Sequence, residues 1–381
     1  MSRKVALRVV LLAVMFSFAA PVATLADDSA ASIAAGGLVS RRETRIVMAK
    51  EVLRISDKKV VVDYDFRNDT DLDVTTEVAF PIPPYSNGFV EGPPPEEQSF
   101  RSFKLWVDGK PIRYESEAKA TLNDKDVTAV LKENKIDIPT FGHFEDKDDS
   151  KGQEVIGTPD FSRLPKTARD QLVTAGIFKL YDQLPAGQWT VHLQYHWTQT
   201  FPAHSTVHIR HEYVPVVGYS PLSVHMVAST LDSGEVKKQG QLNSNINDQL
   251  DQNILPYFCT EPAFLRTLLH DLISGNSMPH PNNLEETGEI EFGSSWVDFI
   301  LTSANTWQRP IEDFTLIIER PRSEQGGKVL ISFCSPASGK VDKLDADHFQ
   351  VHLTNFVPTS ELHIGFFDTP LPKPALPTAV K

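Results

Sequence analysis

Alternation of apolar and polar residues with a period of two dominates the stretch from Lys59 to Gly109. In Lys59–Phe66 the apolar and polar sets fall on opposite faces, as in a half-buried strand. The apolar face holds Val60, Val62, Tyr64 and Phe66. The pattern recurs in LDVTTEVAF, which runs into a proline-rich end, and in SFKLWVDG. The spacing predicts three strands paired as a meander, with a long loop at Tyr85–Gln98.

Further along the chain, strands are predicted at Gln188–Thr198 and Thr206–Val216, joined as a hairpin across TFPAH, and at Pro221–Ser229. Helical spacing occurs at Leu164–Phe178 and Pro262–Ile273. Strands resume at Trp296–Ser303, Phe314–Glu319, Lys328–Cys334, His348–Leu353 and Leu362–Phe367. The fold class is therefore mainly β: an antiparallel β-sandwich-like domain with a few short helices, plus a second β-rich region.

Composition predicts how the chain is divided. Residues 1–26 are a signal peptide, 27–41 an N-terminal arm that lies on the body, and 42–230 the first β domain with a helical insertion. A polar linker at 231–255, a C-terminal β-rich region at 256–367 and a disordered tail at 368–381 follow. Whether the C-terminal region is a separate domain or pairs with the first sheet stays open.

The first 26 residues have the three parts of a secretory signal peptide. A basic start precedes the apolar core Val9–Ala20, which is too short to span a membrane comfortably, and small residues lead to a cut before Asp27. An uncleaved anchor is the alternative. We expect an exported protein, periplasmic or extracellular, with no membrane span after cleavage.

The acidic surface excludes one class of partner. The whole chain carries a formal net charge of −13, and removing residues 1–26, which hold three basic residues and no acids, makes it −16. Such a surface repels nucleic acid and anionic lipid. We expect no nucleic-acid partner.

The two cysteines, Cys259 and Cys334, fit an oxidising compartment, where an even count indicates one disulfide. Two buried free thiols are the alternative. The bridge would close a loop of 75 residues and stabilise the fold by about 4 kcal/mol through loop-closure entropy.

Five of the twelve histidines lie between His192 and His211. His192 and His196 share a strand face but lie about 13 Å apart, too far to converge on one metal ion. The predicted hairpin would set His196 opposite His208, and Glu212 opposite His192, which makes His196 and His208 candidate metal ligands. The alternative is a set of partly exposed strand histidines. The buried face would hold Val191, Leu193, Tyr195 and Trp197.

Other candidate sites lack part of their pattern. Two acidic stretches have the spacing of a calcium loop but lack its glycine or closing glutamate, so solvated turns are favoured. They are Asp69, Asp71 and Asp73, and Asp146, Asp148 and Ser150. Trp307, like the other tryptophans, is expected to pack in the core; the alternative, given its place between a strand and a proline, is partial exposure with sugar or peptide stacking. Motifs for nucleophilic, nucleotide or zinc-hydrolase chemistry are missing from the sequence. We therefore expect neither catalytic residues nor a cofactor.

Several of these elements resemble known families. FPIP, FKLWVDGKPI and Glu117–Ala120 resemble the vault/inter-alpha-trypsin β-domain over about Arg42 to Val227. The helical segment Leu164–Phe178 departs from that domain. The whole mature chain, including DSAASIAAGGL and WTQTFPA, is similar to a family of exported bacterial proteins catalogued as domain of unknown function 4424, which implies location and fold but no activity.

The leading hypothesis is an exported, non-catalytic β-rich module that binds a protein or surface partner in the cell envelope. One rival is an extracytoplasmic hydrolase that acts on envelope polymer. Another is a small-ligand or metal-binding protein. A pocket in which two or more carboxylates, or a histidine–carboxylate pair, converge within hydrogen-bond reach would favour the hydrolase.

Overall fold

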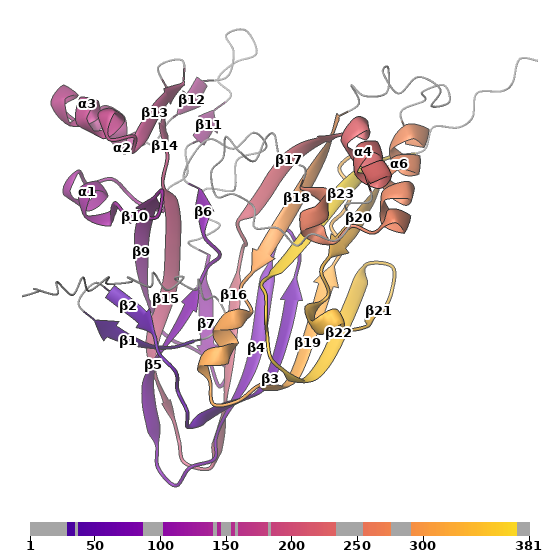
Figure 1. Cartoon of the computed structure of the whole chain (residues 1–381). Coiled ribbons are helices and arrows are strands. Elements are labelled where there is room, and N and C mark those ends of the chain that lie inside the picture. The colour runs from indigo at the N-terminus through magenta and orange to yellow at the C-terminus, as the bar shows by residue number, and fades with distance from the viewer. Residues whose placement is uncertain are drawn as a thin grey trace, which may run out of the picture.

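The structure, a computed structural model, describes residues 29–34, 37–86, 102–139, 143–145, 154–156, 159–181, 184–233, 254–275 and 291–371. The predicted signal peptide, most of the predicted linker and most of the predicted tail lie outside these ranges. The described part is mainly β, as predicted, with two large sheets, a smaller sheet and short helices at the upper end in Figure 1. No helix in it is both long and apolar enough to cross a membrane.

A seven-stranded sheet forms one layer. Its centre is β9 (Glu115–Leu122), β15 (Thr190–Phe201) and β5 (Val74–Pro81). The remaining strands are β10 (Lys125–Asp126), β6 (Tyr85–Ser86), β1 (Ser29–Ala34) and β2 (Gly37–Ser40). The segment predicted as an arm thus supplies β1, which pairs with β5 and extends the sheet.

An eight-stranded sheet forms the opposite layer. In lateral order it contains β21 (Val341–Lys343), β22 (His348–Phe356), β19 (Ile311–Glu319), β3 (Ile46–Ile55), β4 (Val60–Asn68), β16 (Ser205–Tyr213), β7 (Lys104–Val107) and β8 (Lys110–Pro111). β19 runs parallel to β3, whereas the other neighbours are antiparallel. C-terminal strands therefore share one sheet with N-terminal strands.

The main core lies between these two sheets and is rich in aromatic rings. Phe80 of one sheet and His211 of the other have ring centroids 4.7 Å apart, and Trp197 lies 5.3 Å from the same His211 ring. The predicted alternation holds on β15, where Val191, Leu193, Tyr195 and Trp197 are buried. Apolar faces that alternate with polar ones thus meet across the sandwich.

Two predicted strand pairings are wrong. The strands of the predicted meander divide between the two sheets, because β4 pairs with β3 and β16 whereas β5 pairs with β15. The predicted hairpin likewise divides, since β15 and β16 belong to opposite sheets. Each turn is an arch that carries the chain from one layer to the other. The arches are held side by side by Asn68, whose side-chain amide donates to the Phe201 carbonyl over 2.9 Å.

A four-stranded sheet packs beside the sandwich (Figure 1). Its order is β17 (Val217–Ser223), β18 (Glu291–Phe299), β23 (Leu362–Pro370) and β20 (Gly326–Phe333). A second core cluster lies between this sheet and its helices α4 (Val224–Ser233), η2 (Leu255–Phe258) and α6 (Pro262–Gly275). Gly365 permits the close approach of η2, because a Cβ there would lie 2.8 Å from the Phe258 ring.

The strand predicted at Pro221–Ser229 is wrong from residue 224 onward, where α4 begins. Ser223 explains the change, because its hydroxyl accepts a hydrogen bond from the Met226 N–H over 3.1 Å and so caps the first turn. The strand β23 extends to Pro370, inside the stretch predicted as a tail.

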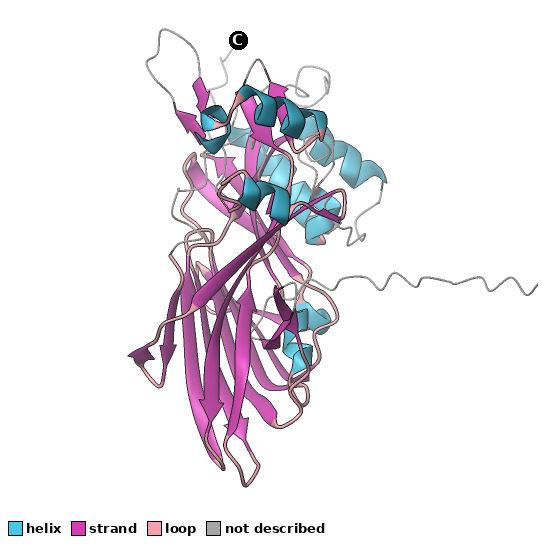
Figure 2. Cartoon of the chain, turned by 90° about the vertical axis from the view of Figure 1, so that its left-hand side faces the viewer, coloured by secondary structure: helices cyan, strands magenta, loops and turns pink. Residues whose placement is uncertain are grey.

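Smaller elements gather at the upper end of the seven-stranded sheet (Figure 1). They are α1 (Thr128–Glu133), α2 (Pro159–Arg163), α3 (Lys166–Thr174) and the hairpins β11 (His143–Glu145)–β12 (Glu154–Ile156) and β13 (Phe178–Tyr181)–β14 (Leu184–Gly187). Two further 3₁₀ turns, η3 (Thr302–Thr306) and η4 (Pro336–Ser338), lie in the C-terminal region. Figure 2 shows the long strands below and most helices above.

Candidate functional site

The predicted metal candidates His196 and His208 do not meet, because their strands lie in different sheets. His196 Nδ1 lies 2.8 Å from Glu77 Oε1, and His208 Nδ1 lies 3.0 Å from Asp65 Oδ1. The predicted hairpin would have placed Glu212 opposite His192. Glu212 instead lies in the eight-stranded sheet, away from His192, and forms ion pairs with Lys59 and Lys104. Among the described residues, no group of three histidines, cysteines or acids is placed to hold a metal ion.

The acidic calcium candidates in the first arch each have a separate partner. Asp69 pairs with Arg67 over 2.8 Å, Asp71 with His204 over 2.8 Å, and Asp73 accepts the Ala203 N–H over 2.9 Å. These carboxylates fasten the two arches to their surroundings. The candidate at Asp146, Asp148 and Ser150 lies outside the described residues.

Trp307 is buried, with 1% of its surface exposed, so core packing is confirmed and the alternative of a partly exposed stacking residue is wrong. The turn that follows η3 folds inward, and the Trp307 ring lies 4.6 Å from that of Phe66. The indole therefore packs in the sandwich core and presents no stacking surface.

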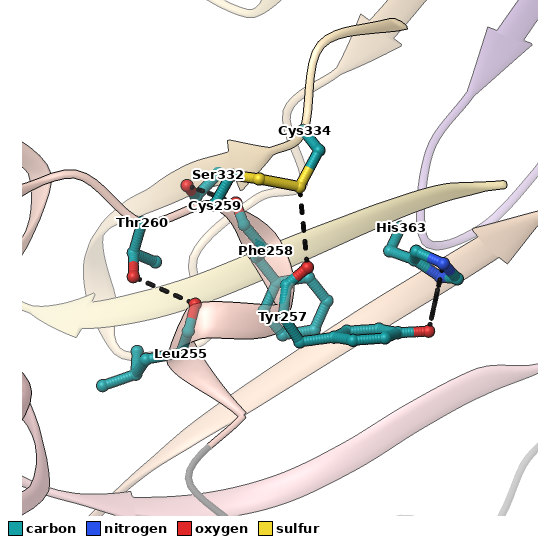
Figure 3. The surroundings of a disulfide bond; sticks show 8 residues. All are labelled: Leu255, Tyr257, Phe258, Cys259, Thr260, Ser332, Cys334 and His363. Atoms are coloured by element: carbon teal, nitrogen blue, oxygen red, sulfur yellow. Dashed lines mark hydrogen bonds between the residues drawn. A yellow bond between two sulfur atoms is a disulfide. The ribbon is translucent and has the colours of Figure 1, made fainter. Parts of the chain in front are cut away.

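The predicted disulfide is present between Cys259 and Cys334, whose Cα atoms lie 5.1 Å apart (Figure 3). It ties the end of η2 to the chain that leaves β20. Because a disulfide sulfur has no hydrogen, the 3.8 Å approach of Cys334 Sγ to the Tyr257 carbonyl is a contact without a donor.

Tyr257, beside the disulfide, belongs to a polar cluster that sequence reasoning missed. Its Oη lies 2.6 Å from His363 Nδ1 (Figure 3), and that nitrogen lies 2.7 Å from Asp298 Oδ1. Burial, followed by the nearby Asp298 and Glu361 carboxylates, raises the pKa of the Tyr257 hydroxyl. The tyrosine thus stays protonated and links η2 to the neighbouring strands β18 and β23.

The outer face of the eight-stranded sheet carries a group of long charged side chains from several strands. Alternation on β3, β4 and β16 turns Arg54, Asp63 and Arg210 outward while their neighbours enter the core. Lateral pairing then aligns residues from six strands, because each residue lies directly opposite its partner on the next strand. One such row is His352, Thr315, Val52, Asp63, Arg210 and Trp106.

Four cations surround two carboxylates on this face, and we call the set the cationic patch. It comprises Arg54, Lys59, Lys104 and Arg210 around Asp63 and Glu212. Asp63 lies 2.8 Å from Arg54 Nη1 and 3.0 Å from Arg210 Nη1. Glu212 lies 2.9 Å from Lys59 Nζ and 3.5 Å from Lys104 Nζ.

The carboxylate side chains of the patch are more buried than its cationic side chains. The carboxylate side chains of Asp63 and Glu212 are 17% and 20% exposed, whereas the four cationic side chains are between 39% and 60% exposed. The hydrogen bond from Lys59 is the main reason that the pKa of Glu212 is lowered, and Lys104 adds to it. Glu212 is therefore held in its ionised form, and the cations of the patch face outward around both carboxylates.

Trp106 borders this patch on β7, directly opposite Arg210 in the strand register. It is partly buried, whereas the other tryptophans of the chain are buried. A tryptophan beside an arginine on a sheet face is a common centre of protein interfaces.

A second charge cluster at the far end of the same sheet is electrically neutral. Arg67 and Arg309 face Asp69 and Glu312, with Arg67 Nη1 2.9 Å from Glu312. Hydrogen bonds to Glu312 and Asp69 raise the pKa of Arg67, and the reciprocal bond lowers that of Glu312. Two cations meet two anions here, whereas the cationic patch has two cations in excess.

A family model for a domain of unknown function, DUF4424, matches residues 26–364 of the chain. No curated protein gives a significant match. Among solved structures, a protein from Legionella pneumophila subsp. pneumophila str. Philadelphia 1, described as a "putative nutrient binding protein", aligns with a TM-score of 0.39 and 14% identity. The alignment covers 90% of this chain and 70% of that one. A TM-score this low carries no argument about function.

Proposed function

The chain belongs to the DUF4424 family, and we propose that it is an exported, non-catalytic module that binds a partner protein in the cell envelope. The binding surface is the outer face of the eight-stranded sheet. The observation that carries this proposal is the partly buried Trp106 opposite Arg210, beside outward-facing cations on adjacent strands.

Three physical properties support this surface. Side chains on a regular sheet are held in register, so little conformational entropy is lost on binding. Arginine and tryptophan are enriched at the centres of protein interfaces, where each contributes large contact area. The face also mixes charge with the partly buried Val52 and Ile317, a composition typical of non-obligate interfaces.

Export is tested by expressing the full chain with a C-terminal tag in a bacterial host and fractionating the cells. We expect the protein in the periplasmic or extracellular fraction, with an intact mass that corresponds to a start at Asp27. A cytoplasmic protein that retains residues 1–26 would contradict export.

Partner binding is tested by cross-linking the purified mature chain in envelope extract and comparing two variants. Trp106→Ala removes the aromatic centre of the proposed surface, and Thr198→Ala alters the outer face of the opposite sheet as a matched control. We expect cross-linked partner to fall at least about fivefold for Trp106→Ala and to persist for Thr198→Ala. Equal cross-linking by all three proteins would overturn the proposed surface.

The rival hydrolase function has one specific point in its favour, the His363–Asp298 pair with Tyr257. The purified chain is therefore assayed for release of soluble fragments from cell-wall polymer. We expect no release above that of His363→Gln. Release that requires His363 would replace the binding proposal by an enzymatic one.

A further inference from the structure

We infer that the cationic patch binds a short acidic segment of a partner polypeptide. This inference rests on the proposed binding function and names the chemistry of its ligand. The patch is a local positive surface on a protein of net charge −13. An acidic ligand is repelled by most of the molecule and attracted here, so the electrostatic field directs it to this site.

The guanidinium groups are held in place with donors to spare. In the described contacts, Arg54 and Arg210 donate hydrogen bonds to Asp63 through Nη1. A guanidinium has five N–H donors, so each arginine keeps others for a ligand carboxylate. Because Asp63 already orients both side chains, less rotamer entropy is lost when a ligand binds.

The size of the patch sets the length of the ligand. The charged residues of the patch come from β3, β4, β16 and β7, which are neighbours in that order. Lys59 directly precedes β4. Three steps between neighbouring strands span about 14 Å, which an extended chain of about four or five residues covers. A segment with two or three acids in that length matches the cations.

The surroundings favour a short segment over a long polyanion. Asp65 lies on β4 next to the patch, and Asp313 lies on the same face of the sheet; their side chains are 37% and 48% exposed. A uniform polyanion that continued across the sheet would meet these carboxylates, and like charges at such a contact are costly. A peptide with few acids ends before it reaches them. Its apolar residues can also contact Trp106.

The direct test uses the purified mature chain and a fluorescein-labelled six-residue peptide with three glutamates, measured by fluorescence polarisation at low salt. We expect binding that weakens as salt approaches 0.15 M, where the Debye length is about 8 Å. The analogue with glutamine for every glutamate should not bind.

Two patch variants and one matched variant locate the site. Arg54→Gln with Arg210→Gln, and separately Lys59→Gln with Lys104→Gln, should each weaken the peptide about tenfold, because two charge contacts are lost. Arg67→Gln with Arg309→Gln removes the same charge from the neutral cluster and should change affinity less than about twofold. Unchanged thermal melting of either patch variant shows that the loss is not unfolding.

Three outcomes separate the inference from the function on which it rests. If the peptide does not bind, or binds the patch variants equally, while cross-linking still requires Trp106, the acidic-segment inference falls and the binding surface stands. If heparin binds more tightly than the peptide and requires the patch, the ligand is a polyanion and the inference also falls. If cross-linking to the partner is unchanged in Trp106→Ala and in both patch variants, the proposed binding surface falls, and the inference falls with it.

Discussion

The sandwich and the helix-covered four-stranded sheet are stabilised in different ways. Aromatic and aliphatic side chains from two large sheets fill the sandwich core, whereas the second core is a smaller cluster beneath α4, α6 and η2. β23 serves both, because Phe366 enters the first cluster and its neighbour Phe367 the second. The smaller core has less apolar area to bury, and it lies beside the disulfide and the Tyr257–His363–Asp298 cluster. The disulfide and the polar cluster thus add to the stability that the small core provides.

The largest expected effect is the loss of the disulfide. Replacing Cys259 and Cys334 by serine should lower the free energy of unfolding by about 4 kcal/mol, because the unfolded chain regains the entropy of a loop of 75 residues. Urea denaturation measures the change. Hydrogen exchange should show β20 and α6 losing protection before β3 and β4. A change below about 1 kcal/mol would mean that the smaller core does not depend on the bridge.

The sandwich should instead be sensitive to pH through His211. Burial lowers its pKa from 6.5 to about 3. The unfolded state therefore binds the proton more readily, and stability falls as pH decreases from 6.5 toward 3, by about 1.4 kcal/mol per pH unit. Between pH 6.5 and 5 we expect a loss of about 2 kcal/mol.

That loss is measured by urea denaturation at both pH values and compared with His211→Leu. The variant should lose about 2 kcal/mol less than the wild type between the two pH values. An equal pH dependence in His211→Leu and wild type would show that other groups govern the acid sensitivity.

Removing one tyrosine hydroxyl in each region compares how much its polar contacts contribute to the free energy of unfolding. Tyr257→Phe removes a hydroxyl that contacts the His363–Asp298 pair, and Tyr114→Phe removes one that donates to the Phe103 carbonyl beside the sandwich core. We expect losses of about 1.5 and about 0.7 kcal/mol, because a hydroxyl next to an ionisable pair is the costlier to remove. Thermal denaturation at pH 7 distinguishes them. The reverse order would show that the cluster beside the disulfide adds little stability.

The smallest expected effect is on the outer face. Trp106→Ala should change the free energy of unfolding by no more than about 1 kcal/mol, because the indole packs at the surface. Chemical denaturation provides the value that accompanies the cross-linking experiment. A loss of several kcal/mol would mean that Trp106 supports the fold, and its effect on partner binding would then be indirect.

Much of the fold followed from local pattern. Alternation predicted the buried face of β15, and the helical spacing of Pro262–Ile273 predicted α6. Pairing did not follow, because a hairpin and an arch require the same alternation and differ only in whether the second strand joins the same sheet. The strand predicted at Pro221–Ser229 overlooked Ser223, whose hydroxyl caps the first turn of α4 in the structure.

The cationic patch could not be predicted from the sequence, because it depends on strand pairing, which the alternation does not determine. Arg54, Lys104 and Arg210 are distant in the chain and meet only because β3, β4, β16 and β7 are neighbours. No spacing rule encodes that lateral order. The cysteine pair was easier to predict, since two cysteines in one chain leave a single possible intramolecular connection.

The parallel pairing of β3 with β19 has a consequence for how the protein folds. Lys50 and Asp313 are partners in that ladder, although 263 positions separate them in the sequence. Contacts of such long range slow folding, because the loop between them must close first. Until residues 311–319 are in place, one edge of β3 exposes unpaired backbone groups, which is the kind of edge that recruits other chains. Fragments that end before Ile311 should therefore aggregate, because β3 is protected only by a strand that is synthesised long after it.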